Sequence, residues 1–349
     1  EIDPLMYKVI WWGMGHSSQQ INVAAHVSVW YAIGALTIGA KPLSEKVSRT
    51  AFLLYILFLQ LASAHHLLAD PGMSATWKIV NTSYMMYLAV LGSLIHGLTV
   101  PGALEAAQRR NGYTKGVFEW LRKAPWGNPA FAGMFLSLVM FGFIGGISGV
   151  VLGTEQLNLL MHNTIYVPGH FHGTVVAGTT LAFMAMTYYV LPLVFQRDII
   201  WPKLARWQPY LFGLGAAGIS LFMMGAGTLG VPRRHWDISL TDAIHPFELP
   251  SGGFLMMGLN GLSAVVASIG GILFVLIAVG TVLWGKRLDR GDAPLTFPLH
   301  KKAAVVAEYG SHATIKLPGT IILVTIFFVS FVLYYFVNWK YLSEIWLLR

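Results

Sequence analysis

The sequence of 349 residues contains no cysteine, and only 11% of its residues are charged. The lack of cysteine excludes disulfides, thiolate-bound zinc, iron–sulfur clusters and thiol nucleophiles. A soluble domain has about 25% charged residues, so this chain carries less than half of the usual charge. Hydrophobic residues make up 55% of the chain instead. This composition points away from a soluble globular enzyme and towards a membrane protein.

Apolar runs recur along the chain at the length that crosses the hydrocarbon core of a bilayer, about 30 Å. Helices suit such runs because a helix satisfies its own backbone hydrogen bonds where no water is available. We therefore predict an all-α fold, a polytopic membrane bundle of about eight transmembrane helices that forms a single domain over residues 1–349. The predicted spans are residues 9–38, 49–68, 77–100, 128–152, 170–195, 211–229, 253–284 and 317–337.

The chain is basic, with 23 lysines and arginines and a formal net charge of +8. In a membrane protein these residues mainly set orientation, because loops rich in lysine and arginine stay in the cytoplasm. Most of them fall at one end of the predicted spans, which we assign to the cytoplasmic side. Both termini are then predicted on the outer side, and the chain is expected to contact lipid and no nucleic acid.

Ionisable residues inside membrane spans are costly and usually functional. His170 and His172 lie two residues apart, so on a helix they point about 200° away from each other. They could therefore serve two cofactors on opposite faces, and imidazole is a usual axial ligand of heme iron. The alternative is a pair of interfacial histidines that hydrogen-bond to neighbouring helices.

A second group of histidines has the spacing of a metal site. His65 and His66 end the second predicted span, directly before Asp70-Pro71-Gly72, where a helix would fray. At a frayed end both imidazoles could reach one metal, and His16 could supply a third nitrogen. Three imidazoles suit copper, iron or zinc. The alternative for the adjacent pair is a solvated helix cap.

Arg233 and Arg234 follow Gly230-Val231-Pro232 at a predicted membrane boundary. Paired guanidiniums recognise carboxylates in a fork geometry, which heme propionates would require. The alternative is a pair of arginines that extend to the membrane interface.

Taken in order, these motifs resemble subunit I of the B-type heme–copper oxygen reductases, and the resemblance covers essentially the whole chain. The motifs that carry it are His16, His65-His66-Leu67-Leu68-Ala69-Asp70-Pro71-Gly72, Thr76-Trp77-Lys78, His162-Asn163-Thr164, Val167-Pro168-Gly169-His170-Phe171-His172 and Gly230-Val231-Pro232-Arg233-Arg234.

The resemblance implies a role for each motif. The active-site metal, copper or a non-heme iron in its place, would be bound by His16, His65 and His66. The proximal ligand of a high-spin heme would be His170, and one axial ligand of a low-spin heme would be His172. The heme propionates would be held by Arg233 and Arg234, and Asp70 would belong to the same polar cluster.

Two departures from the family bear on function. In the family, the first metal histidine lies well inside a longer bundle, whereas His16 lies on the first span here. The resemblance therefore implies a split subunit I, with the amino-terminal helices and the second low-spin heme ligand on another chain, or else a sequence that is part of a longer one. An electron-donor subunit of the cupredoxin or cytochrome c type is the further partner that the resemblance implies.

The second departure lies one helical turn after His16, where oxygen reductases of this type have a tyrosine and this chain has Gln20. Positions i and i+4 share a helix face, which keeps Gln20 near the metal. An amide cannot readily give up the electron and proton that O–O cleavage draws from a tyrosine. Nitric oxide reductases of the superfamily carry a carboxylate at this turn. We predict that Gln20 binds the metal through its carbonyl oxygen or orients nitric oxide, with a purely supporting polar role as the alternative.

A polar stripe on the third span is a candidate proton path. Ser93, His96 and Thr99 follow one another at i, i+3 and i+6, and His26 and Tyr31 are predicted to extend the stripe. Similar residues line a proton channel in B-type enzymes, and histidine relays protons because its pKa lies near neutrality. The alternative is hydrogen bonding between helices.

Together these features predict a respiratory terminal reductase of a prokaryotic cytoplasmic membrane that reduces nitric oxide to nitrous oxide. The first alternative is the reduction of dioxygen to water with proton translocation, as in cytochrome c oxidases. The second alternative is a non-enzymatic heme-binding membrane protein or a transporter.

Overall fold

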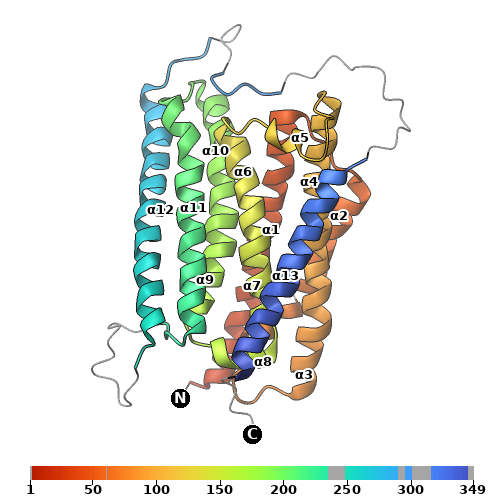
Figure 1. Cartoon of the computed structure of the whole chain (residues 1–349), viewed down its shortest axis with the longest axis vertical. Coiled ribbons are helices and arrows are strands. Elements are labelled where there is room, and N and C mark those ends of the chain that lie inside the picture. The colour runs from red at the N-terminus through yellow and green to blue at the C-terminus, as the bar shows by residue number, and fades with distance from the viewer. Residues whose placement is uncertain (1, 60, 235–247, 290–294, 301–315, 345–349) are drawn as a thin grey trace.

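The computed structural model describes residues 2–59, 61–234, 248–289, 295–300 and 316–344. Within these ranges the regular elements are helices, and the long ones run roughly parallel in one bundle (Figure 1). The elements are α1 (Pro4–Ile38), α2 (Glu45–Leu54), η1 (Tyr55–Leu59), η2 (Ala62–His66), α3 (Ala75–Ile79), η3 (Val80–Met85), α4 (Met86–Arg110), α5 (Glu119–Arg122), α6 (Pro129–Met140), η4 (Phe141–Gly146), α7 (Ile147–Leu152), α8 (Glu155–Met161), α9 (Tyr166–Phe171), η5 (His172–Thr180), α10 (Leu181–Phe195), α11 (Pro202–Thr228), α12 (Ser251–Trp284) and α13 (Pro318–Glu344).

In the described part of the chain, seven helical stretches are long and apolar enough to cross a membrane. Large apolar side chains on their outer faces, such as Leu255 on α12 and Phe336 on α13, are exposed where lipid would contact them. These stretches confirm the prediction of an all-α integral membrane protein. α1 begins and α13 ends at the same end of the bundle (Figure 1).

The predicted span 49–68 is not one continuous helix. α2 passes directly into the π-helical segment η1, and the chain then forms the 3-10 turn η2, which ends at His66. This predicted span is therefore helical but irregular, since a count of apolar residues cannot detect a change in helix type.

Two predicted boundaries also differ from the structure, and proline explains both. The span predicted to begin at residue 211 begins at Pro202, where the missing N–H of proline costs nothing in the first helical turn. The span predicted to end at residue 100 continues through Pro101 to Arg110. Proline is tolerated inside membrane helices because neighbouring groups satisfy the freed carbonyl.

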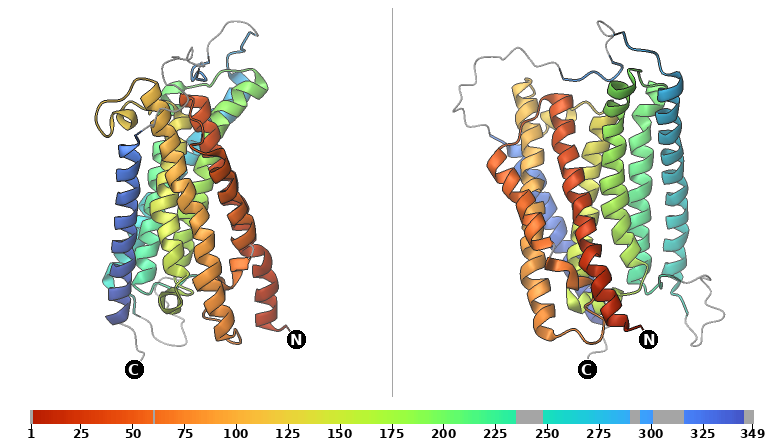
Figure 2. Two further views of the ribbon diagram at one scale, coloured as in Figure 1. Left: turned by 90° about the vertical axis from the view of Figure 1, so that its right-hand side faces the viewer. Right: turned by 180° about the vertical axis from the view of Figure 1, so that it is seen from behind.

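π-helical segments interrupt the long helices beside the segments that carry the histidines. η4 contacts η5, and η3 contacts η2, which itself lies beside α1 (Figure 2). π-helical turns occur frequently at functional sites, because the extra residue re-aims the side chains around it.

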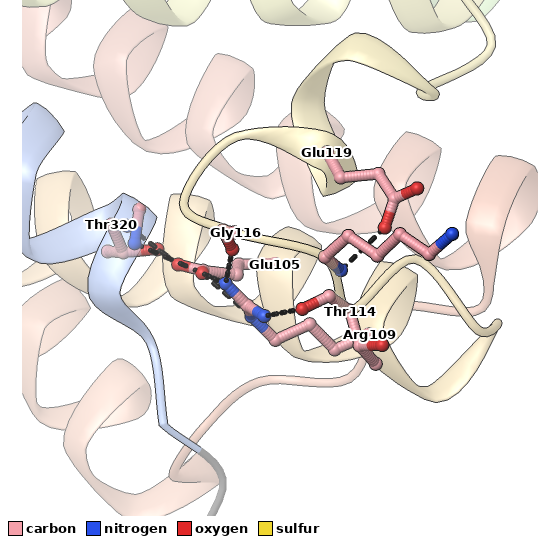
Figure 3. Close-up of polar contacts among 8 residues, drawn as sticks. Glu105, Arg109, Thr114, Gly116, Glu119 and Thr320 are labelled. Atoms are coloured by element: carbon pink, nitrogen blue, oxygen red, sulfur yellow. Dashed lines mark hydrogen bonds and ion pairs between the residues drawn. The ribbon is translucent and has the colours of Figure 1, made fainter.

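A buried carboxylate joins α13 to α4 (Figure 3). Glu105 on α4 is fully buried and forms an ion pair with Arg109 at 2.7 Å. The carboxylate also accepts hydrogen bonds from Gly319 N at 3.1 Å, Thr320 N at 2.6 Å and Thr320 Oγ1 at 2.7 Å. Arg109 in turn donates to carbonyl groups of the loop before α5. These contacts fix the start of α13, whose remaining surface is largely exposed.

Candidate metal and heme site

Three imidazoles converge where α1 passes the end of the broken second segment. One ligand nitrogen from each of His16, His65 and His66 lies within 4.8 Å of the other two. His16 Nδ1 and His66 Nε2 are 2.9 Å apart. Nitrogens that share one ion bind it at about 2.0–2.1 Å each, so this spacing suits a single metal.

Local hydrogen bonds hold the two adjacent histidines in place. The Asn81 side chain, on η3, accepts a hydrogen bond from His65 N at 3.2 Å and donates one to the Leu61 carbonyl at 2.7 Å. The chain then turns away through Gly72, whose φ of +92° favours glycine. Asn81 was not predicted from the sequence, because its partners lie on another helix.

Gln20 and Trp12 flank the cluster on α1. The amide nitrogen of Gln20 lies 3.0 Å from His16 Nε2, as the i, i+4 spacing predicts. The Trp12 indole stacks on His66, with ring centroids 3.8 Å apart and planes 5° from parallel. Trp12 was not predicted from the sequence, although its position four residues before His16 places both on one helix face.

A cavity of about 410 Å³ lies against the three histidines, and His170 of α9 also lines it. Ser148 Oγ is 2.9 Å from His170 Nδ1, which leaves His170 Nε2 as the nitrogen available to a group in the cavity. Gly149 lines the cavity beside this ring, and a Cβ there would come within 3.0 Å of His170 Cε1. The absence of a side chain at position 149 therefore preserves the space around the imidazole.

His172 has different surroundings from His170. It is half-buried, begins η5 and is not among the described residues that line the cavity. Its Nδ1–H donates a hydrogen bond to the Pro168 carbonyl at 2.7 Å. This bond fixes the tautomer and leaves Nε2 as the free ring nitrogen. The two histidines can therefore serve separate cofactors.

Charged side chains gather around the same cavity. Lys8 and Asp70 form an ion pair, and Arg233 and Arg234 also line the cavity. His162, in the loop between α8 and α9, joins them there. Burial lowers the pKa of His162, while the Asp70 carboxylate opposes this effect and the nearby lysine and arginines reinforce it. The structure thus brings the predicted propionate cluster together and adds Lys8 and His162 to it.

The polar stripe on α4 meets tyrosines from two other segments. The Tyr31 hydroxyl of α1 lies 2.7 Å from Thr99 Oγ1 and 3.1 Å from His96 Nδ1. The hydroxyl of Tyr55, the first residue of η1, lies 2.9 Å from Ser93 Oγ. Tyr55 was not predicted, because the change in helix type that brings it to α4 leaves no mark in the sequence.

His26 does not join this stripe, contrary to the prediction. Its Nδ1 lies 2.9 Å from Thr179 Oγ1 of η5, and its buried ring contacts Trp30 and Phe141. His26 precedes Tyr31 by five residues, which separates the two side chains by about 140° around α1.

The residues present fit a metal ion and a heme. His65 Nδ1 is buried without a hydrogen-bond partner, a costly arrangement that a bound metal would resolve. His170 offers a free nitrogen to the same cavity, and Arg233 and Arg234 offer guanidiniums at its edge. One cavity is therefore lined by the three clustered imidazoles, by His170 and by two guanidiniums, a set of groups that suits a metal ion and a heme with its propionates.

Comparison with known proteins finds a matching family model and similar proteins. Residues 1–257 match the family model described as cytochrome c and quinol oxidase polypeptide I. The chain is 33% identical over 300 residues to cytochrome c oxidase subunit 1 of Thermus thermophilus, covering 85% of this chain and 52% of that protein. It is 24% identical over 239 residues to cytochrome c oxidase polypeptide 1 of Halobacterium salinarum, covering 67% of this chain and 36% of that one.

A solved structure is also similar. The cryo-EM structure of a heme-copper terminal oxidase dimer matches 97% of this chain and 58% of its own, with a TM-score of 0.76 and 26% identity. The chain spans about half the length of the Thermus protein. By its sequence, its helical fold and its three-histidine cluster, this chain belongs to the cytochrome c and quinol oxidase polypeptide I family, subunit I of the heme–copper oxidase superfamily.

Proposed function

We propose that this chain is the metal-bearing part of the catalytic subunit of a respiratory terminal reductase. His170 would hold a high-spin heme. Copper or non-heme iron would be held across the cavity by His16, His65 and His66. When bound, these two metals supply the redox and Lewis-acid chemistry that reduces a small gas molecule. The chain itself positions both metals and delivers protons to the cavity between them.

The choice between nitric oxide and dioxygen as the proposed substrate rests on Gln20. Its amide nitrogen lies 3.0 Å from His16 Nε2, and no tyrosine is among the described residues that line the cavity. Cleavage of the O–O bond of dioxygen draws an electron and a proton from a phenol in related enzymes. The coupling of two nitric oxide molecules consumes two electrons and two protons and forms nitrous oxide and water, with no oxidised side chain. We therefore infer nitric oxide as the substrate, oriented by the Gln20 amide or bound beside its carbonyl oxygen.

The protons for this reaction would follow the polar stripe on α4. Tyr31 lies at the end of the stripe that is far from the cavity, where its hydroxyl also lies 3.1 Å from Ser48 Oγ. The near end is Ser93, which lines the cavity. His96 and Thr99 lie between these ends and can pass protons through their hydrogen bonds to Tyr31.

Two partners complete this assignment. The low-spin heme on His172 requires a second axial ligand, which we propose is supplied by helices of the complex outside residues 1–349, on this polypeptide or on another. An electron-donor subunit of the cupredoxin or cytochrome c type would deliver electrons to that heme. The end where α1 begins would face the outside of a prokaryotic cytoplasmic membrane, because the loops at the other end hold most of the lysine and arginine.

Dioxygen reduction to water with proton translocation is the second candidate. The relatives from Thermus and Halobacterium are named cytochrome c oxidases, which favours this activity. The two candidates differ in the role of position 20, where the chain has an amide.

Electrode measurements separate the candidates. The purified holo complex, reduced by an artificial electron donor, should consume nitric oxide and form nitrous oxide, with far slower consumption of oxygen. Rapid oxygen consumption without nitric oxide turnover would establish the second candidate instead. A complex without a Soret band would refute both and support a transporter.

A further inference from the structure

Tyr55 is a buried tyrosine that does not belong to the polar stripe predicted from the sequence. It begins η1, where α2 gives way to the segment that leads to His65, and only 2% of it is exposed. Its hydroxyl lies 2.9 Å from Ser93 Oγ, and its ring centroid lies 5.6 Å from that of His96. Tyr55 therefore contacts two members of the stripe at once.

Ser93 is the point where the stripe reaches the candidate site. It lines the cavity that also touches His16 and His170, whereas His96 is not among the described lining residues. On its far side His96 Nδ1 contacts the Tyr31 hydroxyl, while His96 Nε2 is buried without a hydrogen-bond partner. The hydrogen-bonded path from Tyr31 thus ends at His96, and a separate contact begins at Tyr55 and ends in the cavity.

The backbone of α4 is shaped to admit the Tyr55 ring. A Cβ at Gly92 would lie 3.1 Å from Tyr55 Cε1 and 3.0 Å from the Ala51 carbonyl oxygen. A side chain at position 92 would displace either the ring or the backbone of α2. Glycine at this position lets the phenol lie directly beside Ser93, next along the helix.

We propose that Tyr55 is the relay residue that passes protons from the Tyr31–His96 group to Ser93 at the cavity. In each transfer the phenolic proton of Tyr55 moves to Ser93 Oγ while Ser93 releases its own proton into the cavity. A proton from the His96 side then restores the phenol. No electron moves, and Tyr55 is neutral before and after the transfer. The inference rests on the proposed function only in that the cavity consumes protons, whichever gas is reduced.

The test is proton uptake by the holo complex on anaerobic reduction, followed with a pH-indicator dye in the absence of any gas. Tyr55→Phe keeps the ring beside Gly92 and removes only the hydroxyl. Its matched control is Tyr188→Phe, because Tyr188 is also buried and loses a single hydrogen bond, to Gln208 at 2.9 Å, away from the cavity. Heme absorption and metal content report whether each variant retains its cofactors.

We expect Tyr55→Phe to slow proton uptake by at least about tenfold, as the loss of a positioned proton-transfer group does. The Tyr188→Phe control should keep the original rate, and both should retain their cofactors. Uptake at the original rate in an intact Tyr55→Phe complex would overturn the proposal. If Tyr55→Phe loses its cofactors, proton uptake is measured in Ser93→Ala instead. Slowed uptake in that variant supports the relay, and an unchanged rate overturns it. Slowed uptake in a complex that reduces only oxygen would leave the relay standing and refute the choice of nitric oxide.

Discussion

Replacing Glu105 by alanine should release the start of α13 from α4. The substitution leaves Arg109, whose side chain is only 14% exposed, without its charged partner. It also removes the acceptor for the backbone and hydroxyl donors of Thr320. Loss of one partner from a buried ion pair costs about 3–5 kcal/mol, and each unsatisfied donor adds about 1–3 kcal/mol. Because Arg109 keeps its carbonyl acceptors at Thr114 and Gly116 while the Thr320 donors stay buried, we expect a loss of at least about 3–5 kcal/mol in total.

The exposed ion pair between Arg49 and Glu45 provides the matched control. Its side chains are 78% and 69% exposed, so Glu45→Ala should cost about 0–1 kcal/mol. Both variants would be compared by the free energy of unfolding of the holo complex in mixed detergent micelles. Glu105→Gln, which keeps acceptor capacity without the charge, should fall between the two. Equal losses for Glu105→Ala and Glu45→Ala would refute the idea that the buried carboxylate holds α13.

Two further predictions concern the site itself. Ser148→Ala removes the hydrogen bond that orients His170, and loss of such a partner typically weakens binding at the metal by about 10–100-fold. Resonance Raman spectra of this variant should show a shifted iron–histidine stretch. An unshifted band would contradict the assignment of His170 as the heme ligand. Gln20→Ala should lower nitric oxide turnover much more than Gln19→Ala, because only Gln20 contacts His16 although both side chains line the cavity; equal turnover by the two variants, measured with a nitric oxide electrode, would count against a substrate role for Gln20.

The membrane fold could be predicted from the sequence because hydropathy reports directly on helices that cross a bilayer. The details of the fold could not be predicted in this way. The break between α2 and η2 arises because this segment forms hydrogen bonds of the π and 3-10 type. The same apolar residues could equally form a regular α-helix. The extension of α11 back to Pro202 was missed because residues 202–210 include charged residues and two prolines and therefore lack the apolar run of a membrane span.

Parts of the candidate site that depend on spacing along one helix were predictable. The contact between Gln20 and His16 follows from i, i+4 geometry, and the separation of His170 from His172 follows from two-residue spacing. Other contacts between helices were not predictable. The pairing of Tyr55 with Ser93 depends on how two helices pack, and the placement of His26 beside Thr179 depends on η5.

The central claim is that three imidazoles bind a single metal across a cavity from a heme on His170. Metal analysis and X-ray absorption on the holo complex, for the original protein and for His65→Ala, test it most directly. We expect a non-heme copper or iron bound by nitrogen donors in the original complex, lost in His65→Ala while the heme on His170 remains. A complex with no non-heme metal, or one whose metal is unaffected by His65→Ala, would contradict the proposed metal site.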